Sequence, residues 1–258
     1  MKKLVDFKKY SSIKIGPQLE IEVIDTIDVK NEEFFIIGRA SNLLVNPNTD
    51  KNIAVLGKEF DYIKIEDGKI KIGCATKNGK IFNFAKKNNL ANFEIMAGLP
   101  GCLGGVIKMN AGLKQYEIFN HLDSILTCDG YIKKEDIEYG YRFTNIDKIV
   151  YEAVFDLKEG YNKELKEELV QMRDNQPHDA SAGSCFKNPV DDYAGRLIDV
   201  CGLKGIRVGG MEFSSKHANF LVNLDNGTYE DAIALITMAK EKVKKEFNIE
   251  LQEEVIII

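Results

Sequence analysis

Several residue classes are scarce or poorly spaced in this chain of 258 residues, and each shortage excludes a class of protein. The three histidines show no metal-ligand spacing, so no metal site is predicted. The five cysteines lie far apart and form no CxxC pair, which indicates reduced thiols packed as small apolar side chains and not a disulfide framework. These residues are His121, His178, His217, Cys74, Cys102, Cys128, Cys185 and Cys201.

An excess of positive charge is also missing. Lysine and arginine total 35 against 40 aspartates and glutamates, for a net charge of −5, which argues against a general nucleic-acid or anionic-membrane surface. The N-terminal residues carry charge but no apolar run, and no stretch is long enough to span a bilayer. We therefore expect neither a secretory signal nor a membrane span, and a cytoplasmic location.

Apolar periodicity predicts a mixed α+β chain in two parts. Short strand-like runs dominate residues 1–160, with two Asp-Gly hairpin signals at Asp67 and Asp129. Charged and amphipathic helices become prominent in residues 161–258, and a capping box at Thr228 opens the longest of them. We place the domain boundary near Gly160.

Two glycine-containing loops stand out in the first part. They read GRASNLLV at residues 38–45 and GLPGCLGGVIKMNAG at residues 98–112. Glycine lets a backbone approach a ligand closely, and consecutive inward amides form a nest for a pyrophosphate. The loops match neither a P-loop nor the GxGxxG fingerprint. One such loop alone is as often a plain turn, but two favour a phosphate-rich cofactor.

The ordered set of motifs is more specific than any member. After the two loops come YGYR (139–142), AGSCFKNP (182–189), AGRLID (194–199), GLKGIRVGG (202–210), SKHANFLVN (215–223) and LQEEV (251–255). In this order the chain resembles the MurB family, the UDP-N-acetylenolpyruvoylglucosamine reductases of peptidoglycan synthesis. The resemblance covers nearly the whole chain from about residue 38 onward.

The resemblance implies a flavoenzyme. Its expected fold is an FAD-binding region of the p-cresol methylhydroxylase type, built from two small α+β subdomains, followed by an α+β substrate domain. Its expected reaction is the reduction of UDP-N-acetylglucosamine enolpyruvate to UDP-N-acetylmuramate, with NADPH reducing non-covalent FAD. The partners are then a UDP-sugar and NADPH.

The resemblance also implies roles for individual residues. Ser184 matches the family's proton donor, and Arg142 and Glu254 match the pair that stabilises the enolate-like intermediate. Expected cofactor contacts are Gly38, Arg39, Ala40, Ser41, Asn42, Pro100, Gly101, Gly104, Gly105, Asn110 and Gly112. Expected substrate contacts are Tyr141, Lys187, Asn188 and Lys216.

The expected chemistry suits these residue types. Hydride addition to the enolpyruvyl double bond leaves negative charge delocalised into the carboxylate, and the permanently charged guanidinium of Arg142 can stabilise it. A positioned hydroxyl can then protonate the carbon. If residues 183–188 are extended, Ser184, Phe186 and Asn188 share one face and Cys185 faces the core. We therefore assign the proton to Ser184 and not to Cys185.

Departures from the family pattern leave two alternatives open. The family usually has glycine where Ala40 stands, and an Asn-Thr pair where this chain has Ser11-Ser12. One alternative is another flavoprotein of the same fold, such as an oxidase. The other is a degenerate nucleotide-binding homologue without turnover; a purely structural module gives no reason for the two loops.

Overall fold

The computed structural model describes residues 1–29 and 33–258 as two compact units, each made of several chain segments. The change of unit after Asp174 differs from the predicted boundary near Gly160, and two N-terminal segments join the C-terminal half. The first unit comprises residues 1–3, 21–39 and 51–174, and the second comprises residues 4–20, 40–50 and 175–258. The mixture of helices and strands in both confirms the α+β class.

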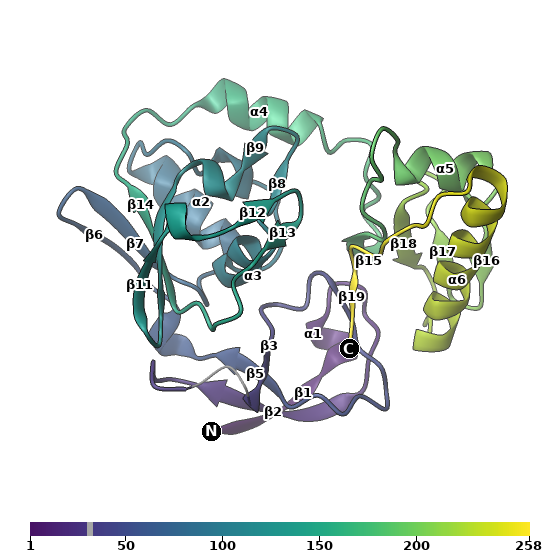
Figure 1. The fold of residues 1–258 in the computed structure, drawn as a ribbon, viewed down its shortest axis with the longest axis horizontal. Coiled ribbons are helices and arrows are strands. Elements are labelled where there is room, and N and C mark those ends of the chain that lie inside the picture. Colours follow the sequence, from purple (N-terminus) through teal and green to yellow (C-terminus); the bar gives the residue numbers. More distant parts are fainter. Residues whose placement is uncertain (30–32) are drawn as a thin grey trace. The chain divides into compact units, whose positions relative to one another are not determined.

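A five-stranded antiparallel sheet forms the centre of the first unit, in the order β11-β10-β14-β7-β6 (Figure 1). Both predicted Asp-Gly hairpins are present in it. At the β6–β7 turn Asp67 and Gly68 have φ of 51° and 73°, the left-handed conformation that a two-residue hairpin turn favours. The strands are β6 (Ile63–Glu66), β7 (Lys69–Gly73), β10 (Leu122–Thr127), β11 (Gly130–Lys133) and β14 (Glu152–Asp156).

Three helices bury their apolar faces in the core of this sheet. They are α2 (Asn78–Lys87), α3 (Leu103–Lys108) and α4 (Lys163–Gln171), and the 3-10 turn η3 (Glu94–Met96) contributes to the same core. Leu169 of α4 lies in the same hydrophobic cluster as Ile81 and Ile107. Because α4 contributes to this core, residues 161–174 belong to the first unit and not to the second.

The other strands that contribute to the first unit form smaller sheets, and β1 and β2 each contain residues of both units. A second sheet has the order β1-β2-β5-β3, with β5 parallel to both β2 and β3, so two sheets are present as two small subdomains require. Two further hairpins pair β8 with β9 and β12 with β13. The bounds are β1 (Lys2–Asp6), β2 (Gln18–Ile24), β3 (Phe35–Ile36), β5 (Ile53–Leu56), β8 (Gly112–Leu113), β9 (Tyr116–Glu117), β12 (Tyr139–Gly140), β13 (Phe143–Thr144), η2 (Lys58–Phe60), η4 (Ile118–Asn120) and η5 (Lys134–Asp136).

The second unit packs two helices on an antiparallel sheet of order β15-β18-β17-β16 (Figure 1). The predicted capping box is confirmed: the Thr228 hydroxyl accepts from the Asp231 amide, and the Asp231 carboxylate accepts from the Thr228 amide. The elements are α1 (Phe7–Tyr10), β4 (Leu43–Leu44), β15 (Ala180–Ser184), α5 (Ala194–Val200), β16 (Arg207–Val208), β17 (Met211–Phe213), β18 (Phe220–Asn223), α6 (Tyr229–Phe247) and β19 (Ile256–Ile257). No helix in residues 1–29 or 33–258 is both long and apolar enough to cross a membrane.

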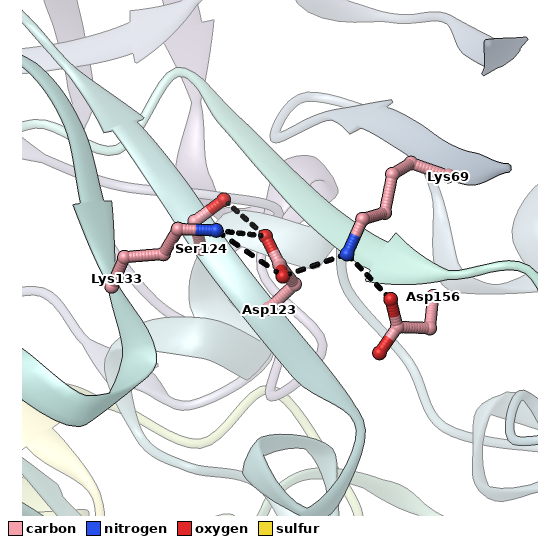
Figure 2. A network of polar contacts seen from close by, with 5 residues as sticks. All are labelled: Lys69, Asp123, Ser124, Lys133 and Asp156. Atoms are coloured by element: carbon pink, nitrogen blue, oxygen red, sulfur yellow. Dashed lines mark hydrogen bonds and ion pairs between the residues drawn. The ribbon is translucent and has the colours of Figure 1, made fainter. Parts of the chain in front are cut away.

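A charged network braces the solvent face of the five-stranded sheet (Figure 2). The Asp123 carboxylate accepts from Lys69 Nζ at 2.8 Å, from Ser124 Oγ at 2.8 Å and from Lys133 Nζ at 3.2 Å. Lys69 also pairs with Asp156 on the neighbouring strand. These bonds, the one from Lys69 foremost, lower the pKa of Asp123 to about 2. The network contacts none of the predicted site residues, so we read it as structural.

The substitution Asp123→Asn tests this reading. A carboxylate whose pKa is depressed in the folded state adds stability above its ordinary pKa of 3.8, and that stability is lost as pH falls toward about 2. We expect the substitution to lower the free energy of unfolding near neutral pH by on the order of 1 kcal/mol. Urea unfolding across the acid range measures the difference.

The control is Asp136→Asn, at an exposed carboxylate in η5 outside the network. It is expected to change stability little at any pH. A wild-type advantage over Asp123→Asn that stays constant down to pH about 2 would contradict the role given to the ion pairs.

Candidate active site

The two glycine-containing loops lie against each other in the first unit. A Cβ atom added to Gly38 would meet the Cys102 sulfur at 2.7 Å, so this approach requires glycine. Burial raises the pKa of the Cys102 thiol, while the backbone N–H groups of Gly105 and Arg39 and the charge of Arg39 act in the opposite direction. The thiol thus links the first loop to the second.

The second loop is part turn and part helix. Gly98 and Gly101 take left-handed φ values of 71° and 101°, and exposed Gly105 has no atom within 4 Å of a hypothetical Cβ. The Leu103 and Gly104 amides donate to backbone carbonyls at 3.0 and 2.9 Å. These two amides are therefore not available to an anion, and the predicted run of inward amides is interrupted by α3.

The first loop continues into the second unit, where its shape is held from two sides. Ala40 is buried with φ of 49°, a conformation that glycine takes more readily, so the departure from the family pattern costs backbone strain. Ser12 supports the turn: its amide donates to the Ala40 carbonyl and its hydroxyl to the Ser41 carbonyl, both at 3.2 Å. Asn42 Nδ2 donates to the Glu254 carbonyl at 2.9 Å.

Arg142 stands on a strained turn of the first unit. Gly140 and Phe143 pair across the β12–β13 hairpin, which leaves Tyr141 and Arg142 as its two turn residues. Arg142 has φ of 54°, which is uncommon for a residue with a long side chain. Its guanidinium lies 5.0 Å from the Tyr141 ring centroid and donates to the Gly112 carbonyl at 3.2 Å. Strain of this kind clusters at functional sites, which supports the predicted role of Arg142.

A second arginine near this turn was missed by the sequence analysis. Arg173 Nη1 donates to the Ala97 carbonyl at 3.2 Å, and a Cβ on Gly98 would lie 3.6 Å from the same nitrogen. Burial first, and then the positive charge of Arg142, lower the pKa of Arg173. Two guanidinium groups beside the second loop make this part of the first unit favourable for an anion. Arg173 lies outside the quoted motifs, so no local signal pointed to it.

Two other predicted cofactor residues of the first unit have internal roles. The Asn110 side chain is fully buried and bonds to protein groups. Gly112 has no room for a side chain, since its Cβ would lie 2.1 Å from the Tyr116 carbonyl oxygen. Contacts of these residues and of Pro100 with a cofactor stay predictions.

In the second unit, Ser184 and Glu254 lie on hydrogen-bonded segments. Ser184 ends β15, and the next residues run antiparallel to the segment before β19, with Phe186 opposite Glu253. The Glu254 amide donates to the Cys185 carbonyl at 2.8 Å. Both Ser184 and Glu254 are half-buried, so the structure brings two of the three predicted catalytic residues onto neighbouring segments.

The condition set for residues 183–188, one extended strand with alternating faces, is not met. Gly183 has φ of 81°, β15 ends at Ser184, and Cys185 and Phe186 are both buried in the same core cluster. Phe186 enters the core because Asn219 pairs with it like a neighbouring strand. Asn219 Oδ1 accepts from the Phe186 amide at 3.0 Å, and Nδ2 donates to its carbonyl at 2.8 Å.

Cys185 does face the core, as expected. Its exposed fraction is 2%, and burial, followed by the charges of Glu253 and Glu254, raises the pKa of its thiol. A thiol that resists ionisation is neither a good nucleophile nor a good proton donor at neutral pH.

The predicted substrate residues occupy varied positions. Tyr141 is 49% exposed beside Arg142 in the first unit. In the second unit Asn188 is exposed but its Oδ1 accepts from the Ala194 amide at 3.1 Å, at the start of α5. Lys216 is exposed and Lys187 half-buried, and the Lys187 amide donates to the Gln252 carbonyl at 2.9 Å. Their substrate contacts stay predictions.

Comparison with known proteins assigns the family. A protein of Campylobacter jejuni strain RM1221 named UDP-N-acetylenolpyruvoylglucosamine reductase is 47% identical over 260 residues, covering 99% of this chain and 100% of that protein. One of the same name from Helicobacter pylori strain 26695 is 41% identical, covering 98% of each chain. The chain belongs to the UDP-N-acetylenolpyruvoylglucosamine reductase family. It is therefore an enzyme of this family, and the predicted resemblance is confirmed.

Two further comparisons agree with this family. The model of the C-terminal domain of UDP-N-acetylenolpyruvoylglucosamine reductase matches residues 176–258, close to the last segment of the second unit, 175–258. The crystal structure of the reductase (MurB) from Thermus caldophilus superimposes with a TM-score of 0.84 and 29% identity, covering 100% of this chain and 98% of that one. The reductase fold thus extends over the whole chain.

The strain at Arg142 predicts that glycine at this position gives a more stable protein than alanine, the reverse of the usual order. Arg142→Gly and Arg142→Ala remove the same guanidinium, but alanine keeps the left-handed strain that glycine relieves. We expect Arg142→Gly to be more stable by about 1 kcal/mol in urea unfolding.

The matched control is Arg196 in α5, where glycine is expected to be less stable than alanine by about 1 kcal/mol. Finding the same order at both positions would show that Arg142 is not strained.

Proposed function

We propose that this chain reduces UDP-N-acetylglucosamine enolpyruvate to UDP-N-acetylmuramate, with FAD as bound cofactor and NADPH as the source of electrons. The observation that carries the proposal is the local backbone structure that holds the three residues expected to be catalytic. Arg142 occupies a strained turn, while Ser184 and Glu254 lie on paired segments. Residues held in sparsely populated backbone conformations cluster at functional sites, which supports the role proposed for Arg142.

The two loops fit a flavin nucleotide. Gly38 and Cys102 bring the loops together, and Gly98, Gly101 and Gly105 present backbone without side chains. Arg142 and Arg173 add positive charge next to the second loop. When bound, FAD would take hydride from NADPH and supply it to the terminal carbon of the enolpyruvyl group. The remaining chemistry falls to the side chains of the chain.

Arg142 would hold the substrate carboxylate and the negative charge that develops there. A guanidinium fork binds a carboxylate with two parallel hydrogen bonds, and it keeps its charge throughout the reaction. The hairpin fixes its backbone, so little reorganisation is needed when the charge appears.

Ser184 would donate the proton that completes the reduction. The new C–H bond forms at the carbon next to the carboxylate, and the serine oxygen is left to recover its proton from solvent or a neighbouring acid. Glu254, on the segment paired with residues 185–187, is the polar partner for this exchange. Lys187, Asn188, Lys216 and Tyr141 remain the proposed contacts to the UDP-sugar.

Ser184→Ala tests the proposal, with Cys185→Ala as its matched control. We expect Ser184→Ala to keep the NADPH-driven reduction of the flavin and to lose its reoxidation by the enolpyruvyl substrate by at least about 100-fold, the lower range for general acid catalysis. Anaerobic stopped-flow absorbance of the flavin separates the two steps.

Cys185→Ala is expected to cost stability, because it removes a buried sulfur, but to retain both half-reactions. A selective loss of reoxidation in Cys185→Ala, with Ser184→Ala unaffected, would reverse the assignment. Reoxidation by oxygen but not by the enolpyruvyl substrate would favour the oxidase alternative.

A further inference from the structure

Two segments of the first unit are tied together around Arg142. Thr144 Oγ1 donates to the Lys108 carbonyl at 2.8 Å, and Lys108 Nζ donates to the Ile146 carbonyl. Arg142 itself donates to the Gly112 carbonyl. Residues 108–112, the end of the second glycine-containing loop, are therefore hydrogen-bonded to residues 142–146 at three points. We call these bonds, with those of Asn110, the loop–hairpin hydrogen bonds.

Asn110 lies in the middle of the segment that makes the loop–hairpin hydrogen bonds. Its side chain is 0% exposed, its φ is 43°, and both ends of its amide are used. Oδ1 accepts from the Phe119 amide at 3.3 Å, and Nδ2 donates to the Gly140 carbonyl at 3.1 Å and to Glu117 Oε2 at 2.8 Å. Gly140 directly precedes the two turn residues, so Asn110 fixes the base of the turn.

The turn needs such a constraint. A non-glycine residue in the left-handed region persists only where the surrounding structure over-determines it. Relaxation of the turn would rotate the Arg142 side chain away from its present direction. A misplacement of about 1 Å at a reacting group can cost about 100-fold in rate.

We propose that Asn110 is a positioning residue for Arg142: its buried amide holds Gly140, and through Gly140 the strained turn that presents the guanidinium to the substrate carboxylate. The inference rests on the proposed function for its chemical meaning. It gives Asn110 a role different from the cofactor contact that the family motif suggested, because its side chain is turned into the protein.

The first test is Asn110→Asp, with Asn120→Asp as the matched control. The new carboxyl group cannot donate to Gly140 while ionised, and it would face the Glu117 carboxylate. Asn120 also donates from its amide to a backbone carbonyl, that of Gln115 at 2.7 Å, but it is exposed in η4. We expect Asn110→Asp to slow flavin reoxidation by the enolpyruvyl substrate about 100-fold and to leave reduction by NADPH near wild type.

The pH dependence of flavin reoxidation tests the bond from residue 110 to the Gly140 carbonyl a second time. Protonation lets the new carboxyl group donate again, so the defect of Asn110→Asp is expected to shrink as pH falls. Asn120→Asp is expected to follow the wild-type profile in both half-reactions.

A double-substitution cycle separates positioning from a general structural defect. If Asn110 acts through Arg142, Asn110→Asp slows the wild type about 100-fold but barely changes Arg142→Ala, because the group it positions is gone. An equal slowing in both backgrounds would overturn the inference. Should Asn110→Asp fail to fold, Thr144→Val removes another of the loop–hairpin hydrogen bonds. It is expected to slow reoxidation less, and again only where Arg142 is present.

A stability measurement tests the positioning role independently of enzyme activity. If the wild-type flavin is not reoxidised by the enolpyruvyl substrate, the proposed function fails. The positioning role can still be tested by stability. If Asn110 maintains the strain at position 142, the stability advantage of Arg142→Gly over Arg142→Ala is expected to be smaller when Asn110→Asp is also present, because the released turn carries less strain. An undiminished advantage in urea unfolding would refute the positioning role.

Discussion

Backbone hydrogen bonds between residues 185–187 and 252–255 are the contact on which the site of the second unit depends. They join two segments more than sixty residues apart in the sequence, and they place Ser184 beside the segment that carries Glu254. Two asparagine side chains add bonds to these segments: Asn219 bonds to Phe186, and Asn42 bonds to the Glu254 carbonyl. A backbone fixed in this way sets the positions from which both side chains project.

The first unit uses a different device for the same purpose. Arg142 is presented by a tight turn whose strain is maintained by bonds from residues 108–112. The residues that make these bonds belong to the motif first read as a cofactor loop. The loop thus exposes glycine backbone at Gly105 and bonds, through the buried Asn110 side chain, to the hairpin that carries Arg142.

Local features of the fold could be predicted from the sequence because short-range physics decides them. The Asp67-Gly68 turn and the Thr228 capping box depend on residues within one turn of each other. The burial of Phe186 and the packing of α4 in the core of the first unit could not be predicted. Both depend on partners distant in the sequence, Asn219 in one case and the core around Ile107 in the other.

The site followed the same rule. The residues proposed for the site were selected through ordered motifs. Arg173 was not selected because it lies outside them and is distinguished only by its place beside Gly98 and Arg142. The internal role of Asn110 was missed for a related reason. A motif shows that a residue type is required but does not show whether its side chain faces a ligand or the protein.

The central claim is that one flavin passes electrons from NADPH to an enolpyruvyl UDP-sugar. The most direct measurement is the visible absorbance of the purified protein without oxygen, recorded before and after NADPH and again after UDP-N-acetylglucosamine enolpyruvate. The account predicts a flavin band that bleaches with NADPH and returns with the substrate. A protein that cannot be loaded with FAD, or a bleached flavin that the substrate fails to restore, would contradict it.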